Sequence, residues 1–127
     1  MNKLFPIVLA LLFFGCESKP EFTITDKELF KFFMENRSEA ELKYLDKVGD
    51  IKGTVSSIGK SGGDFTVGLY DETQKGSWIT RGVVCRFDKK SDIEHLKPGD
   101  NVTIRGRIGD LFARNALNIE DCILLSK

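Results

Sequence analysis

The sequence predicts a small, mostly β domain that carries a helix near its N-terminal end. Two patterns predict this class. Apolar residues first recur at three- and four-residue steps between positions 25 and 44, which is the spacing of a helix with one buried face. After Gly49 they alternate with polar residues, and Gly, Asp, Asn and Pro punctuate the chain, as expected for short strands joined by turns.

The helix has a recognisable start. Thr25 is followed three residues later by Glu28, which is the form of a capping box. The residues that recur at helical spacing after it form one face that packs on a larger structure. They are Leu29, Phe32, Phe33, Asn36, Ala40 and Tyr44.

Five short strands follow the helix. Alternating apolar residues place them at 51–55, 65–69, 83–87, 102–106 and from 117 toward 124. Turns or loops are expected at 59–64, 71–82 and 109–115, and a brief helical turn at 92–96. Cys122 falls out of phase with Ile119, which requires a bulge in the last strand.

This element order is that of the OB-fold, a five-stranded Greek-key barrel with a short helix between strands 3 and 4. Gly53 and Gly106 fall in the middle of strands, where a missing side chain permits the tight coiling of a small barrel. The main alternative is an open five-stranded sandwich. With 127 residues in the chain, there is room for only one such domain.

The first fifteen residues indicate export. Lys3 precedes an apolar run from Leu4 to Phe14, which is the architecture of a signal peptide and is too short to span a bilayer as a helix. The apolar run, Gly15 and Cys16 resemble a lipobox, with Phe13 and Phe14 where the usual box has Leu and a small residue. The alternative is an ordinary secretory peptide that is cleaved elsewhere.

The expected organisation is therefore a signal peptide at 1–15, a lipidated tether at 16–24 and the domain at 25–127. Two or three acyl chains on Cys16 would anchor the protein stably in a lipid bilayer. Glu17 stands where aspartate signals inner-membrane retention in enteric bacteria. The expected location is the cell envelope, on the outer membrane, facing the periplasm or the cell surface.

The segments described above resemble a known family, the OB-fold lipoproteins similar to the tRNA-anticodon-binding domain (tRNA_anti-like), which are common in Bacteroidetes. The resemblance covers residues 25 to 125 and implies the fold and the cellular location, but no catalytic or binding residues. It is carried by Asn36, Ala40 and Tyr44 of the helix and by the segments 48–55, 84–87, 96–106 and 119–122.

Cys85 and Cys122 are expected to lie on neighbouring strands, because the third and fifth strands of an OB-fold are adjacent. Export would place them in an oxidising compartment, where such a pair suggests a disulfide. The alternative is two reduced thiols in the core. The sequence has no CxxC pattern, so a metal site is not expected.

No catalytic constellation is found, and neither an enzyme nor a cofactor is expected. Gly59-Lys60-Ser61 lacks the earlier Gly and the following helix of a phosphate-binding loop. His95 is the only histidine, and its neighbours do not have the spacing of a zinc site or a nucleophile triad. We expect it on the surface.

The remaining candidate is a ligand-binding face on the second and third strands and the loops beside them, where OB-folds bind ligands. Aromatic and basic residues there could stack on a ligand or hold an anionic group. They are Trp78, Arg81, Arg86, Phe112 and Arg114. The alternative is that Trp78 covers a barrel end and the arginines are solvated.

The function favoured by the sequence is a non-enzymatic, membrane-tethered module that binds a protein, a peptide or an envelope saccharide. Single-stranded nucleic acid is the second hypothesis, and an enzyme is the third. The chain has 19 basic and 19 acidic residues, whereas a dedicated binder of nucleic-acid backbones usually has a basic excess.

Overall fold

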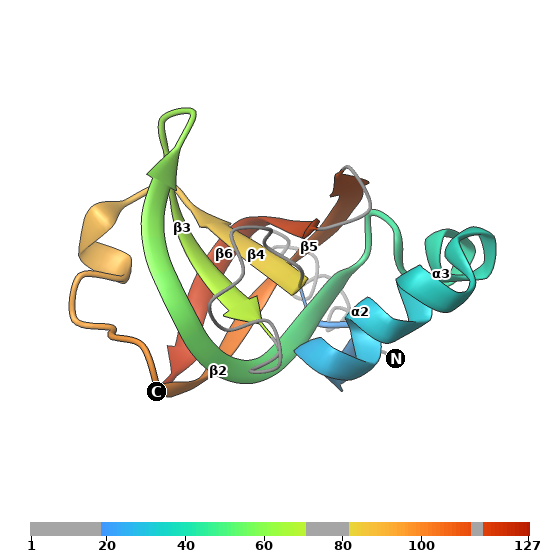
Figure 1. Ribbon diagram of the computed structural model, residues 1–127, viewed down its shortest axis with the longest axis horizontal. Coiled ribbons are helices and arrows are strands. Elements are labelled where there is room, and N and C mark those ends of the chain that lie inside the picture. Colours follow the sequence, from blue (N-terminus) through green and yellow to red (C-terminus); the bar gives the residue numbers. More distant parts are fainter. Residues whose placement is uncertain (1–18, 71–81, 113–115) are drawn as a thin grey trace, which may run out of the picture.

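The structure is a computed structural model and describes residues 19–70, 82–112 and 116–127. A five-stranded barrel forms its centre, with two helices at one end and the β4–β5 connection at the other (Figure 1). The elements in order are β1 (Phe22–Thr25), α2 (Asp26–Glu35), α3 (Arg37–Tyr44), β2 (Val48–Ser61), β3 (Asp64–Tyr70), β4 (Gly82–Phe87), the 3-10 helix η3 (Lys90–Asp92), β5 (Asn101–Phe112) and β6 (Ala116–Ser126).

The barrel closes through the pairing of β2 with both β3 and β5. Its strand order is β2-β3-β4-β6-β5, and β5 returns to pair with β2. The pairs within the barrel are antiparallel except β4 with β6, which is parallel. The predicted five-stranded closed barrel is therefore confirmed, and the open sandwich is excluded.

The helix was predicted to be the first element of the fold. This prediction is wrong, because a short strand, β1, precedes the helices. β1 pairs in parallel with β2, with Phe22 opposite Gly49. The Phe22 ring occupies the space that a side chain on Gly49 would need, and it packs edge-on against Tyr44 with 4.7 Å between ring centroids. Residues 22–24, assigned to the tether from the sequence, thus belong to this strand.

The predicted helix is divided in two at Asn36. Thr25 caps α2 as expected, because its Oγ1 accepts a hydrogen bond from the Glu28 backbone N–H at 3.2 Å. Asn36 is exposed and not part of the apolar face. Its Oδ1 accepts from the Glu39 N–H at 3.3 Å and begins α3, as expected for a residue that favours helix caps.

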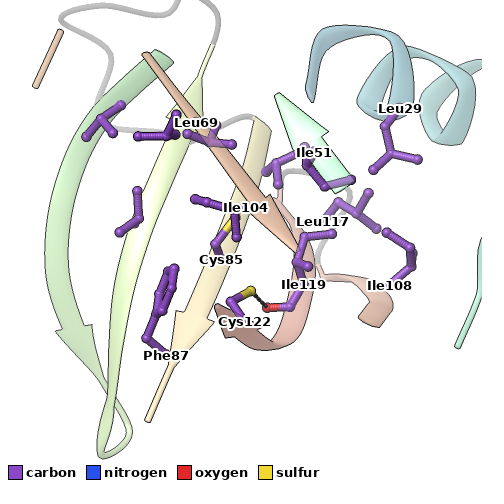
Figure 2. Close-up of a cluster of buried hydrophobic side chains, with 14 of the residues drawn as sticks. Leu29, Ile51, Leu69, Cys85, Phe87, Ile104, Ile108, Leu117, Ile119 and Cys122 are labelled. Atoms are coloured by element: carbon purple, nitrogen blue, oxygen red, sulfur yellow. Dashed lines mark hydrogen bonds between the residues drawn. The ribbon is translucent and has the colours of Figure 1, made fainter. Parts of the chain in front are cut away.

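The core fills the barrel and extends under α2 and α3. The predicted helix-face residues Leu29, Phe33, Ala40 and Tyr44 are buried, and Phe32 is packed against the core at its margin. Figure 2 shows inward-facing residues of the strands gathered with Leu29. The largest fully buried side chains of the barrel include Phe87, Ile51, Leu69, Ile104, Ile108, Leu117 and Ile119.

The predicted bulge in the last strand is confirmed. Arg107 pairs with Glu120 and Arg105 with Ile123, so Gly106 alone faces two residues of β6, Asp121 and Cys122. Asp121 has a positive φ of 51°. The extra residue restores the phase, and Ile119 and Cys122 are both buried.

Three expected connections differ from the structure. β2 extends through Ser61, which leaves Gly62 and Gly63, both at positive φ, as the hairpin turn. β5 extends through Phe112 where a loop was expected from Gly109. The helical turn predicted at 92–96 is a 3-10 helix at Lys90–Asp92.

Candidate ligand-binding surfaces

The predicted ligand-binding residues are only partly within the described residues. Trp78, Arg81 and Arg114 lie outside them. Phe112 is the last residue of β5. Arg86 lies on β4, and its Nη1 is 3.3 Å from Asp64 Oδ2 on β3. Of the five residues, the structure thus places only Arg86 and the backbone of Phe112, and the site that they were expected to form stays a prediction.

The outer face of β3 and β4 carries small and polar residues around Arg86. Thr66 pairs with Arg86 and Gly68 with Val84 across the two strands. Thr66, Val84 and Arg86 alternate with the buried Val67 and Cys85, so their side chains point outward. The guanidinium on this face is paired with a carboxylate, which lowers its capacity to attract a free anion.

The other described arginines are also paired with carboxylates. Their nitrogen to oxygen distances lie between 2.7 and 3.4 Å. Because each positive charge already has a partner, none of the described arginines forms an unpaired basic patch of the kind that binds phosphate backbones. The pairs are Arg37 with Glu41, Arg105 with Asp50, and Arg107 with Asp46 and Asp121.

A second surface is an open groove of about 810 Å³ on a different side of the barrel. It lies over β2 and β5, beside the start of α2 and the end of β6. We call it the β2–β5 groove. Its volume is in the range of sites that bind small ligands. The residues that line it are Thr25, Asp26, Lys27, Lys52, Gly53, Thr54, Gly99, Asn101, Val102, Thr103, Ser126 and Lys127.

The strand register places the polar residues of the groove side by side. Lys52 pairs with Thr103 and Thr54 with Asn101 across β2 and β5. Thr54 donates its hydroxyl to Asn101 Oδ1 at 2.8 Å. This bond orients the Asn101 amide, so that hydroxyl and amide groups form a row along the groove.

Two lysines give the groove its free positive charge. Lys27 and Lys52 are exposed, and among the described residues no carboxylate lies within ion-pairing distance of either ammonium. Lys127 differs, because its Nζ is 3.6 Å from Asp100 Oδ2. The one side-chain carboxylate of the lining, Asp26, is buried beside Gly53.

Asp100 supports the rim of the groove next to Gly99. Its carboxylate accepts a hydrogen bond from the Lys97 backbone N–H at 3.0 Å and another from the Lys97 ammonium at 3.2 Å. The backbone hydrogen bond, with help from the two lysines, lowers the pKa of Asp100 below its ordinary value. The carboxylate therefore remains ionised and holds the turn before β5.

The groove lysines were not singled out from the sequence. Lys52 falls within the strand that was predicted at 51–55. Lys27 lies in the first turn of α2, where acidic residues are usually favoured by the helix dipole. That departure was the one available signal, but the presence of Lys27 and Lys52 in one groove depends on β1, which was not predicted.

Cys85 and Cys122 are both buried and are free thiols in the structure. A hydrogen bond with Cys122, followed by burial, raises the pKa of the Cys85 thiol well above its usual value. The expectation that the two residues lie on neighbouring strands is confirmed, because β4 pairs with β6. The disulfide expected in the exported protein stays a prediction.

The described segments contain neither a cluster of metal-binding side chains nor a helix that could span a membrane. In residues 19–70, 82–112 and 116–127, no three His, Cys, Asp or Glu side chains gather where they could hold a metal ion. His95 is exposed as predicted. The same segments contain no helix of the length and apolar character needed to cross a bilayer.

Comparison with known proteins identifies the family. The tRNA_anti-like family matches residues 10–123. The chain belongs to the tRNA_anti-like family. This confirms the resemblance carried by the helix, by the strand segments and by the turn before β5, while an origin in Bacteroidetes stays an expectation.

One solved structure shares the fold of this tRNA_anti-like chain, and a second is similar to part of it. A crystal structure of a "putative nucleic acid-binding lipoprotein" from Klebsiella pneumoniae is 19% identical and covers 98% of this chain and 100% of its own, with a TM-score of 0.63. A "putative aspartyl-tRNA synthetase" from Leishmania major is 16% identical, with a TM-score of 0.48, over 83% of this chain and 21% of its own. No curated protein matches the tRNA_anti-like chain.

Proposed function

We propose that this protein is a lipid-anchored, non-enzymatic binding module of the bacterial cell envelope, and that it binds an acidic saccharide in the β2–β5 groove. The observation that carries the proposal is the composition of the groove. Two unpaired ammonium groups stand beside a row of hydroxyl and amide groups, within a barrel of the OB-fold, which commonly binds oligosaccharides and oligonucleotides.

The chemistry of the groove fits a sugar that carries a carboxylate or a phosphate. Thr54, Asn101 and Thr103 can exchange hydrogen bonds with sugar hydroxyls. Lys27 and Lys52 can donate charge-assisted hydrogen bonds to the acidic group. An open groove suits one stretch of a longer glycan better than an enclosed cavity would.

Anchoring and location are inferred from the sequence. Cys16 follows an apolar run and a small residue, and only five residues separate it from β1. Six residue steps span at most about 20 Å when extended. A diacylglycerol on Cys16 would therefore hold the barrel close to the membrane, on the outer membrane facing the periplasm or the cell surface, where acidic envelope glycans are within reach.

A non-enzymatic role is supported by the chemistry of the described residues. The two buried cysteines are nucleophiles without access to solvent, and the raised pKa of Cys85 keeps its thiol protonated. The exposed His95 is the only histidine of the chain. These residues do not provide the pairing of nucleophile and base that covalent catalysis requires.

Binding to oligogalacturonate, with neutral dextran as the uncharged counterpart, tests the proposal by calorimetry. Lys27→Gln/Lys52→Gln should weaken binding to oligogalacturonate by about tenfold or more, because two charge-assisted hydrogen bonds are lost. Lys89→Gln/Lys90→Gln removes the same charge at η3, outside the groove, and should bind as wild type does. Equal binding of dextran, or equal loss in the two variants, would overturn the proposal.

Nucleic-acid binding is the second candidate, because the Klebsiella protein with the similar fold bears that description. Its expected site is the outer face of β3 and β4 with Trp78, Arg81, Arg86, Phe112 and Arg114. A single-stranded oligonucleotide should then bind with an affinity that falls steeply with salt. Such binding, without binding of oligogalacturonate, would replace the first candidate with the second.

Intact mass of the protein extracted from its native membrane tests the anchor separately. We expect a chain that begins at Cys16 and carries diacylglycerol. An unlipidated chain would show that the module is exported without this anchor.

A further inference from the structure

We propose that Cys85 and Cys122 are joined by a disulfide in the exported protein, and that this bond fastens the bulge of β6 to β4. The proposal rests on export of the chain for its oxidant. It goes beyond the binding function, because neither thiol lines the β2–β5 groove.

The strand register places the two cysteines on adjacent strands. Cys85 on β4 pairs in parallel with Ile119 on β6, and Cys122 follows Ile119 after the bulge. In a regular strand, a residue three positions later would face the opposite side. The bulge turns Cys122 back into the barrel, so that both cysteine side chains are buried in the core (Figure 2).

The surroundings of Cys122 show that its position is well defined. Its thiol donates a hydrogen bond to the Ile119 carbonyl oxygen at 3.3 Å. Gly106 on β5 has no side chain, and an added Cβ would lie 2.8 Å from Cys122 Sγ. The sulfur thus occupies the space that Gly106 leaves, and its influence on Cys85 raises the pKa of that thiol.

The bond requires an external oxidant, for which a low-molecular-weight or protein disulfide suffices. One thiolate attacks that disulfide, forms a mixed disulfide and releases a thiol. The second cysteine then displaces the remaining external sulfur as a second thiol, so two protons and two electrons leave the protein. Burial of both sulfurs in the folded barrel means that this exchange takes place while the barrel is open or still folding.

The test is to refold the full chain with glutathione disulfide and glutathione, alkylate the remaining thiols under denaturing conditions, and digest with trypsin. We expect the peptide 82–86, which contains Cys85, to be linked to the peptide 115–127, which contains Cys122. Reduction should separate the two peptides. Alkylation of both cysteines before reduction, or a link between Cys16 and either of them, would overturn the proposal.

Thermal unfolding gives an independent measurement. The bond closes a loop of about 37 residues and should raise the Tm by roughly 10–20 °C over the reduced protein. Cys85→Ser, Cys122→Ser and the double variant should lose this increment equally, and reductant should not lower their Tm further. A reductant effect that persists in the double variant would contradict the assignment. Since refolding in vitro supplies its own oxidant, a linked pair in an unlipidated protein would refute the anchor and not the disulfide.

Discussion

Gly106 is the position where the fold should be least tolerant of a single added carbon. A Cβ at Gly106 would lie 2.5 Å from Ile119 Cγ2, 2.8 Å from Cys122 Sγ and 3.0 Å from the Glu120 carbonyl oxygen. The first two neighbours are buried, with 0% and 5% of their surfaces exposed, and the third belongs to the backbone of the bulge. None of the three can move away without disturbing the pairing of β5 with β6.

We therefore expect Gly106→Ala to lower the free energy of unfolding by about 2–3 kcal/mol, in the upper part of the range for overpacked cores. For a domain of this size, the Tm should fall by about 10–15 °C. The assay is urea unfolding followed by circular dichroism, with reductant present to keep both cysteines as thiols. Gly59→Ala is the matched control on β2, because its Cβ would meet only Thr66 Oγ1, at an ordinary 3.5 Å.

A Gly106→Ala variant within about 0.5 kcal/mol of wild type would refute this reasoning, as would an equal loss in Gly59→Ala. The double variant Gly106→Ala/Cys122→Ala tests the same contact from the other side. Because it removes one of the three close contacts, its loss should be smaller than the sum of the two single losses.

Three further predictions concern the core, a helix cap and pH. Phe87→Ala should lower the free energy of unfolding, measured in urea, by about 3–5 kcal/mol, because the ring is fully buried. A loss under about 1 kcal/mol would mean that the side chains of the barrel interior are not closely packed around this ring. Thr25→Ala should cost about 1 kcal/mol, since Glu28 N–H loses its cap, and an unchanged urea midpoint would contradict this. Asp100→Asn should be less stable than wild type at neutral pH. Because the pKa of Asp100 is lowered, its carboxylate stabilises the fold fully at pH values above the ordinary pKa of 3.8, and this stabilisation is lost as the pH falls through the lowered pKa. The urea midpoints of the variant and the wild type should therefore converge in acid. A difference that stays constant with pH would contradict this prediction.

The barrel strands were predictable because each buries one face and therefore alternates. Val83, Cys85 and Phe87 are all fully buried on β4, as their spacing indicated. The phase error at Cys122 was equally informative, since a strand with one face in the core can correct such an error only by a bulge.

β1 and the break between the helices were not predictable from spacing. β1 has four residues, too few for a periodic signal, and it is held by the Phe22 ring over Gly49, a contact between distant parts of the chain. Asn36 fitted the helical spacing, but its side chain accepts a hydrogen bond from the Glu39 N–H and starts a new helix. Such a side-chain bond to the backbone competes with continuation of the first helix, and apolar spacing does not detect it.

The candidate site was less predictable than the fold. Residue type alone selected loop residues and Arg86, whose charge is paired with Asp64 across the hairpin. The β2–β5 groove arises from the closure of the barrel and from the junction of β1 with α2. Lys27 and Lys52 become neighbours of one groove only after both have formed, and no short sequence window contains that information.

The parallel pairing of β1 with β2 also determines how the barrel would respond to force. A pull on the N-terminal segment along the strand direction would load the β1–β2 hydrogen bonds in shear, so that they share the load and do not open one at a time. The Phe22 ring, seated over Gly49 and against Tyr44, would have to leave its place before β1 could slide. The pairing of β1 with β2 would thus resist a force applied to the N-terminal segment before that force reached the rest of the barrel.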